Sequence, residues 1–139
     1  MRQIIIAIFI MLGSQVNAEV LMHCGSSKGQ AYIFNHPVFN SEPSGWHKDG
    51  INNGRIILTK DGDNWDILFG DAAGSSGYRS DGATVILLAW TDEFIRLGAF
   101  ANNYSDVYNF NLKEKTVAWT SNKSGPLMGK AAVYLSSCR

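Results

Sequence analysis

The chain has 139 residues, of which 45% are hydrophobic and 17% are charged, and its formal net charge at pH 7 is zero. This composition is typical of a globular domain and excludes a disordered chain, a collagen-like chain and a polycationic nucleic-acid binder. The length fits one domain. We therefore expect a single folded unit with no nucleic-acid partner.

The first eighteen residues have the pattern of a secretory signal peptide. Arg2 supplies a positive charge, Ile4–Leu12 is an unbroken apolar run, and the small residues that end at Ala18 resemble a cleavage site. The apolar run is too short for a membrane span, which needs about 20 residues in a helix. We expect residues 1–18 to be removed, which leaves 19–139 as one β-rich domain, secreted or periplasmic, without a membrane span.

Two cysteines, Cys24 and Cys138, lie near the two ends of that domain. In an oxidising compartment such a pair most often forms a structural disulfide, and this bond would place the first strand beside the last. The alternative, a metal or redox pair, has less support because the chain contains no Cys-x-x-Cys motif. His23 and His36 show no ligand spacing either, so we expect no metal and no cofactor.

Short apolar runs of period two, separated by turn residues, follow one another along the chain. Asp61-Gly62 is typical of a tight hairpin, because these residues tolerate the positive φ angles of such turns. The expected strands are Val20–Cys24, Gln30–Phe34, Arg55–Lys60, Asn64–Phe69, Ala83–Trp90, Phe94–Ala101, Val107–Leu112, Thr116–Thr120 and Lys130–Ser136. The main expected turns and loops are Gly25–Gly29, Asn35–Gly54, Gly70–Gly82 and Ser121–Gly129.

This order of elements predicts an all-β fold, an antiparallel meander of about eight to nine strands. Closure into a small barrel or a sandwich would remove the exposed sheet edges, and the expected disulfide favours closure. The interior of so small a barrel is expected to be filled by side chains such as Trp65, Trp90 and Trp119. A cavity for a small apolar ligand is the alternative.

The Gly/Ser-rich loop Gly70–Gly82 is the main candidate for recognition, because long loops on rigid β scaffolds often carry binding residues. It would place hydroxyls, an aromatic ring and charges at a flexible tip, and Tyr and Arg often anchor protein interfaces. A plain connector is the alternative. The candidate partner-binding residues are Ser75, Ser76, Tyr78, Arg79 and Asp81.

A second candidate is formed by Trp46, His47 and Asp49 in the irregular segment. A histidine beside a carboxylate can act as an acid/base pair, which would suit a hydrolase. No Gly-x-Ser-x-Gly nucleophile motif accompanies the pair. We therefore favour a tryptophan that closes one barrel end beside a solvated histidine, and we expect no catalytic residues.

Short motifs are spread over nearly the whole chain after residue 18. They are Cys24-Gly25-x-Ser27-Lys28-Gly29-x-Ala31-Tyr32, Gly45-Trp46-x-x-Asp49-Gly50-Ile51, Asp66-Ile67, Asp71-Ala72, Asp81-Gly82-Ala83 and the final Cys138. This set resembles a group of short secreted bacterial proteins that have no assigned activity. The resemblance therefore implies no function.

The loop motif Ser76-Gly77-Tyr78 gives a second resemblance, at the level of architecture. It is similar to the Ser-Gly…Tyr loop with which periplasmic lysozyme inhibitors, which are small barrels, enter the enzyme cleft. In this chain Tyr78 follows the glycine directly, whereas the inhibitor motif has a spacer. Such a likeness is an analogy of fold, and function has to be argued from the site.

The sequence thus predicts a secreted or periplasmic, non-enzymatic binding protein that acts through its loops. Its partner is expected to be a protein or a component of the cell envelope. An inhibitor of a cell-wall hydrolase such as lysozyme is one alternative, and a small-ligand carrier is another.

Overall fold

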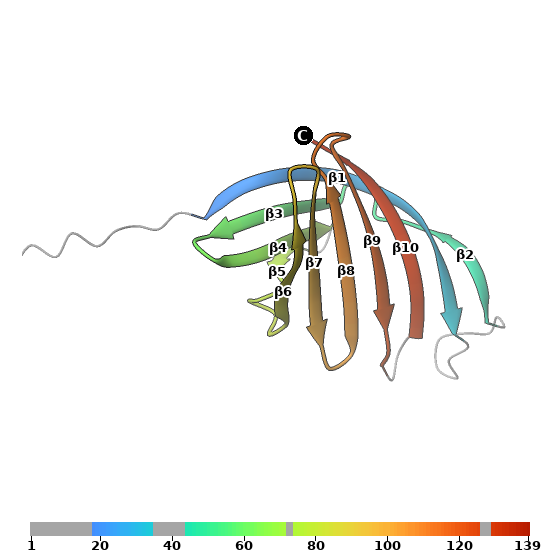
Figure 1. Ribbon diagram of the computed structural model, residues 1–139. Helices are drawn as coiled ribbons and strands as arrows, with labels where there is room; N and C mark the ends of the chain where they lie inside the picture. Colours follow the sequence, from blue (N-terminus) through green and yellow to red (C-terminus); the bar gives the residue numbers. More distant parts are fainter. Residues whose placement is uncertain (1–17, 35–43, 72–73, 126–128) are drawn as a thin grey trace, which may run out of the picture.

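The computed structural model describes residues 18–34, 44–71, 74–125 and 129–139, and these residues form an all-β domain. Ten antiparallel strands belong to one continuous sheet, which curls into a half-barrel (Figure 1). Within the described residues, no helix is long and apolar enough to cross a membrane. The strands are β1 (Glu19–Phe34), β2 (Gly45–Asp49), β3 (Arg55–Asp61), β4 (Asn64–Asp71), β5 (Gly74–Gly77), β6 (Thr84–Trp90), β7 (Phe94–Ala101), β8 (Tyr104–Asn111), β9 (Thr116–Lys123) and β10 (Gly129–Cys138).

The strand order of the sheet is β5-β4-β3-β1-β10-β9-β8-β7-β6. The long strand β1 joins two parts of this sheet, β5-β4-β3 on one side and β10-β9-β8-β7-β6 on the other. Its first half pairs with β3, through Glu19–Cys24. Its second half pairs with β10 on one edge and with β2 on the other. Because β1 contributes to both parts, the sheet can fold over itself without a break in strand pairing.

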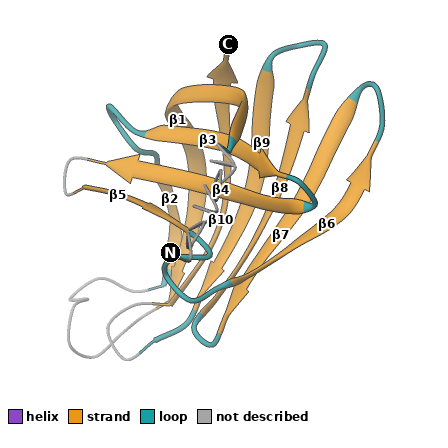
Figure 2. Cartoon of the chain, turned by 90° about the vertical axis from the view of Figure 1, so that its left-hand side faces the viewer, coloured by secondary structure: helices purple, strands orange, loops and turns teal. Residues whose placement is uncertain are grey.

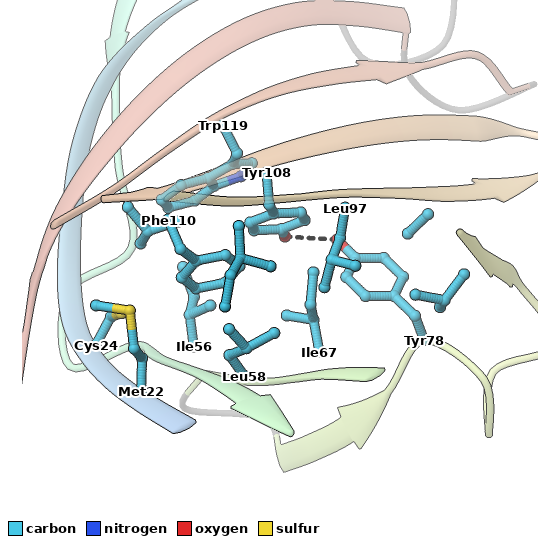
Figure 3. Packing of buried hydrophobic residues seen from close by; sticks show 14 of the residues in the cluster. Met22, Cys24, Ile56, Leu58, Ile67, Tyr78, Leu97, Tyr108, Phe110 and Trp119 are labelled. Atoms are coloured by element: carbon cyan, nitrogen blue, oxygen red, sulfur yellow. Dashed lines mark hydrogen bonds between the residues drawn. The ribbon is translucent and has the colours of Figure 1, made fainter. Parts of the chain in front are cut away.

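The core lies where the two parts of the sheet face each other. The strands β3 and β4 cross in front of β7 and β8 (Figure 2), and apolar side chains from both parts meet between them (Figure 3). Alternate residues point inward along each strand, as the pleat requires. The hydrophobic side chains that are no more than 2% exposed are Met22, Cys24, Ala31, Leu58, Ile67, Leu97, Ala99, Phe110 and Val117.

The predicted disulfide between Cys24 and Cys138 is present and joins residues 114 positions apart. The two cysteines are partners in the β1–β10 ladder, so the bond fastens the first strand to the last. The predicted hairpin at Asp61-Gly62 is also confirmed. It connects β3 and β4, and Gly62 has the positive φ of 58° that such a turn favours.

The turn expected at Gly25–Gly29 is wrong, because these residues lie inside β1. The strand changes register between Cys24 and Ser27 instead of turning back. A Cβ atom on Gly29 would lie 2.1 Å from the Val133 carbonyl oxygen, so glycine permits the close approach of β10. Gly29 therefore allows close contact between two strands and does not form a turn.

Two expected loops contain strands. The described part of Asn35–Gly54 includes β2, which pairs with β1, whereas residues 35–43 lie outside the described residues. The described part of Gly70–Gly82 includes the end of β4 and all of β5, which form a short hairpin. β2 and β5 are two additional strands, but the expected strands Val20–Cys24 and Gln30–Phe34 form one strand, β1, so the nine strands expected become ten.

The half-barrel has an open seam between β6 and residues 64–67 of β4, the part of β4 that does not pair with β5 in the described sheet. Arg79 bridges this seam, since its Nε donates to the Trp65 carbonyl at 2.8 Å and its Nη2 to the Val85 carbonyl at 3.0 Å. The rings of Trp65 and Trp90 also meet edge to face across it, 5.4 Å apart. Side chains therefore join the two sheet edges that hydrogen-bond ladders leave open.

Candidate functional site

The inward-facing residues of β8 change in character along the strand. Phe110, Tyr108, Asp106 and Tyr104 occupy alternate positions, and the first three are buried. Their register partners on β9 are Val117, Trp119, Ser121 and Lys123. Both strands thus change from apolar to polar residues in the same direction. We call the part of the interior around Phe110 and Val117 the apolar end, and the part around Asp106 and Ser121 the polar end.

A cavity of about 360 Å³ occupies the polar end. This volume falls at the lower end of the range for small-molecule pockets, about 300–1,000 Å³. The expectation that side chains fill the whole interior is therefore wrong at this end. Of the three interior tryptophans that we expected, Trp119 lines the cavity, Trp65 is buried and Trp90 is 57% exposed. Other lining residues include Tyr78, Tyr104, Asp106, Lys130 and Tyr134.

Tyr78, Asp106 and Tyr108 form a buried hydrogen-bond chain at the cavity. The Tyr78 hydroxyl donates to Asp106 Oδ2 and lies 2.7 Å from the Tyr108 hydroxyl (Figure 3). Burial raises the pKa of both tyrosines above the ordinary value, so both keep their protons at neutral pH. Because the single proton of Tyr78 goes to Asp106, the Tyr108 hydroxyl must donate to Tyr78.

Within the described residues, two polar atoms of this end, Asp106 Oδ1 and Tyr104 Oη, are buried without a hydrogen-bond partner. Asp106 is only 3% exposed. The ion pairs found within the described residues are Lys113–Glu93 and Lys130–Asp49, so neither involves Asp106. A buried polar group without a partner costs about 1–3 kcal/mol. These two atoms therefore indicate where a bound group would be stabilised.

A compact charged cluster of Asp49, Lys130 and Tyr134 also lines the cavity. Lys130 Nζ lies 2.9 Å from Asp49 Oδ2 and 2.8 Å from the Tyr134 hydroxyl, which donates to the same carboxylate oxygen at 2.6 Å. Burial alone would raise the pKa of Asp49, but hydrogen bonds from Tyr134 and Lys130 outweigh it and hold that pKa below its ordinary value. The charges of this cluster are therefore internally matched.

The partner-binding candidates of the Gly70–Gly82 loop support the cavity wall. Tyr78 is 5% exposed and points into the cavity, so it does not lie at a flexible tip. The Ser76 hydroxyl contacts Ser80 and donates to Asp81. Arg79 is held by the two carbonyls at the seam, and Ser75 is exposed on β5. A tight turn thus presents Tyr78 inward.

The second group of candidates is divided by the structure. Asp49 lies in the charged cluster and lines the cavity. Trp46 is 67% exposed and packs edge to face on Tyr32, so it does not close a barrel end. His47 is half-buried on β2 and pairs in register with Ala31. In the part of the chain that the structure describes, no group of three potential metal ligands occurs.

The sequence interpretation missed Tyr104, Asp106 and Lys130 as site residues. A signal for Asp106 was present, because it is the one acid on a strand face that otherwise carries Tyr104, Tyr108 and Phe110. A carboxyl group at an inward position of an aromatic face is an informative buried polar residue. Lys130 carries no such local signal, since its partner Asp49 is distant in sequence.

Comparison of the chain with protein-family models gave no match, and comparisons with curated proteins and with solved structures gave no significant match. The functional argument therefore depends on the geometry of the cavity and on the chemistry of its walls.

Proposed function

We propose that the protein is a secreted or periplasmic binding protein that holds a small polar molecule in the cavity of the polar end. The observation that carries this proposal is the pair of buried, unpartnered atoms, Asp106 Oδ1 and Tyr104 Oη, in a cavity of about 360 Å³. A ligand with hydrogen-bonding groups would give both atoms the partners that the described part of the chain does not supply.

This proposal modifies the small-ligand alternative of the sequence analysis, because the cavity wall favours a polar ligand over an apolar one. Asp49, Asp106 and Lys130 contribute charged groups to it, and Ser121 contributes a buried hydroxyl. An apolar molecule would remove water from those groups and would leave Asp106 Oδ1 without a partner, which is unfavourable. Specific recognition of a polar ligand would use them.

We infer a supporting role for the loop, in addition to the partner-binding role that the sequence predicts. The bonds of Ser76 with Ser80 and Asp81 fix the turn, and the turn fixes Tyr78 against Asp106. Rigid support of this kind is what a preorganised binding site requires. The export expected from residues 1–18 agrees with the disulfide, since structural disulfides persist in oxidising compartments.

The experiment that tests the proposal fills the cavity. Binding of benzylamine, benzyl alcohol and benzoate is measured by isothermal titration calorimetry on the wild type, on Ser121→Phe and on Ser121→Leu. Ser121 is 2% exposed and lines the cavity, so a larger side chain would take the ligand's space. We expect at least one probe to bind, and both variants to weaken it at least about tenfold.

Thr120→Phe is the matched control, because Thr120 is the exposed neighbour on the same strand. It should leave probe affinity unchanged. Thermal melting without a probe shows that each variant is folded, and the smaller Leu variant serves if the Phe variant is not. Absence of any probe binding, or equal binding to the wild type and to a folded Ser121 variant, would contradict the proposed function.

A further inference from the structure

We propose that the ligand carries a positively charged amine, and that its ammonium group binds between Asp106 Oδ1 and Tyr104 Oη. This inference rests on the proposed function, because it concerns the same cavity. It adds the charge and the chemical class of the ligand.

The hydrogen-bonding capacity of Asp106 Oδ1 and Tyr104 Oη favours an amine. A carboxylate oxygen accepts hydrogen bonds and a phenol oxygen can also accept them, whereas an ammonium group donates three. One ammonium group therefore has enough donors for both Asp106 Oδ1 and Tyr104 Oη, the two unpartnered atoms. The Tyr78 hydroxyl already serves the other carboxylate oxygen. The site therefore still lacks hydrogen-bond donors.

The buried carboxylate of Asp106 has no positively charged partner among the described residues. Burial of a carboxylate is favourable only if a positive group pairs with it. The nearby bases are engaged elsewhere, since Lys130 pairs with Asp49 and Arg79 binds two backbone carbonyls. Arg55 and Lys123 also line the cavity, but both are exposed, and water screens their charges. A cationic ligand would supply what Asp106 lacks.

Aromatic rings surround the position proposed for the ammonium group. The ring of Tyr78 lies 5.7 Å from that of Tyr104, 5.9 Å from that of Tyr108 and 4.9 Å from that of Phe69. Aromatic rings grouped about a polar pocket attract cations, as in the cages that bind alkylammonium ligands. Rings and carboxylate together favour an ammonium group over a neutral donor such as an alcohol.

The electrostatic field agrees with this geometry. Burial raises the pKa of Tyr104, and the negative charges of Asp81, Asp106 and Asp66 raise it further. The three carboxylates that disfavour a phenolate at this position favour a cation there for the same reason. The negative potential would also attract an amine from solution.

The test compares probes of similar shape and different charge at constant ionic strength. We expect wild-type protein to bind benzylamine at least about tenfold more tightly than benzyl alcohol, and benzoate more weakly than either. Asp106→Asn keeps the shape of the side chain and removes its charge. It should weaken benzylamine at least about tenfold and benzyl alcohol less than about threefold.

Two further variants complete the test. Tyr104→Phe should weaken benzylamine about threefold, because it removes one acceptor and keeps the ring. Asp92→Asn changes the net charge equally but lies in the exposed turn between β6 and β7, so it should have no effect. The wild-type ratio of benzylamine to benzyl alcohol needs no variant, so a poorly folded Asp106→Asn protein would not block the test.

The possible failures are distinguishable. If all three probes bind equally well and Ser121→Phe abolishes their binding, the cavity binds ligands but the amine inference is wrong. Similar losses of benzylamine and benzyl alcohol in Asp106→Asn would also overturn it. If no probe binds at all, the proposed function fails, and the inference fails with it.

Discussion

The two ends of the interior have the same backbone geometry and nearly the same burial, yet they differ in chemistry. At the apolar end, Leu97 and Phe110 are 0% exposed. At the polar end, Asp106 and Ser121 are 3% and 2% exposed, but they carry oxygen atoms. Burial alone thus does not separate a core from a site. The separation comes from polar atoms that the fold buries without partners, because these disfavour the folded state until something binds.

The disulfide at the apolar end should make a large contribution to stability. Replacement of Cys24 and Cys138 together by serine should lower the free energy of unfolding by up to about 4.7 kcal/mol, the chain-entropy value for a loop of ~100 residues. Urea denaturation followed by tryptophan fluorescence measures it. A decrease in the free energy of unfolding of less than about 1 kcal/mol would show that the disulfide does not matter for stability.

Phe110→Ala tests the apolar end directly. Removal of a fully buried phenyl ring leaves a cavity and should lower the free energy of unfolding by about 3–5 kcal/mol. Asn109→Ala, at the exposed neighbouring position on β8, should change it by less than about 0.5 kcal/mol. If the two variants unfold at the same urea concentration, the distinction between inward and outward faces fails.

The seam between the sheet edges should depend on Arg79. Arg79→Ala removes the hydrogen bonds to the Trp65 and Val85 carbonyls and should lower the free energy of unfolding by about 2 kcal/mol. Arg96→Ala, an exposed arginine on β7, is the control and should cost less than about 0.5 kcal/mol. Equal stabilities of the two variants would mean that the bridge does not hold the seam.

The charged cluster at the polar end should give the smallest effect, about 1 kcal/mol, and a pH-dependent one. The pKa of Asp49 is lowered from 3.8, so its contribution is present above that pH and is lost as the pH falls through the lowered value. The pKa of Lys130 is raised from 10.5, since hydrogen bonds to Tyr134 and Asp49 outweigh burial, which alone would lower it. Its contribution is therefore lost as the pH rises above that value.

Asp49→Asn should accordingly be less stable than the wild type at pH 7 and equally stable at an acidic pH below the lowered pKa of Asp49, where the wild-type carboxyl group is protonated. Urea denaturation at both values measures the difference. A difference that persists unchanged in acid would assign the effect of the substitution to packing and not to charge.

The sequence predicted those parts of the fold that depend on neighbouring residues. The Asp61-Gly62 hairpin is local, and the Cys24–Cys138 bond follows from there being no other cysteine. The continuity of β1 through Gly25–Gly29 was not predictable in this way. Glycine and serine favour turns, and here they are held extended by β10 and β2, whose residues are distant in sequence.

The candidate site was hidden for the same reason. Asp106 and Tyr108 come from β8, Lys130 and Tyr134 from β10, and the register of the sheet brings them to one cavity. The alternation of β8 does place Asp106 on an inward aromatic face, and this was the available clue. The inward direction of Tyr78 depends on the turn that Ser76 and Asp81 fix, which composition does not reveal.

The bond between Cys24 and Cys138 also determines what happens when the backbone is cut. The turn between β8 and β9 exposes Lys113 and Lys115, which are natural targets for a trypsin-like protease. A single cut there separates a piece with Cys24 from a piece with Cys138, but the two stay covalently linked. Clipped molecules should migrate as one band on a gel without reductant and as two bands with it. One proteolytic event therefore does not release a fragment of the sheet.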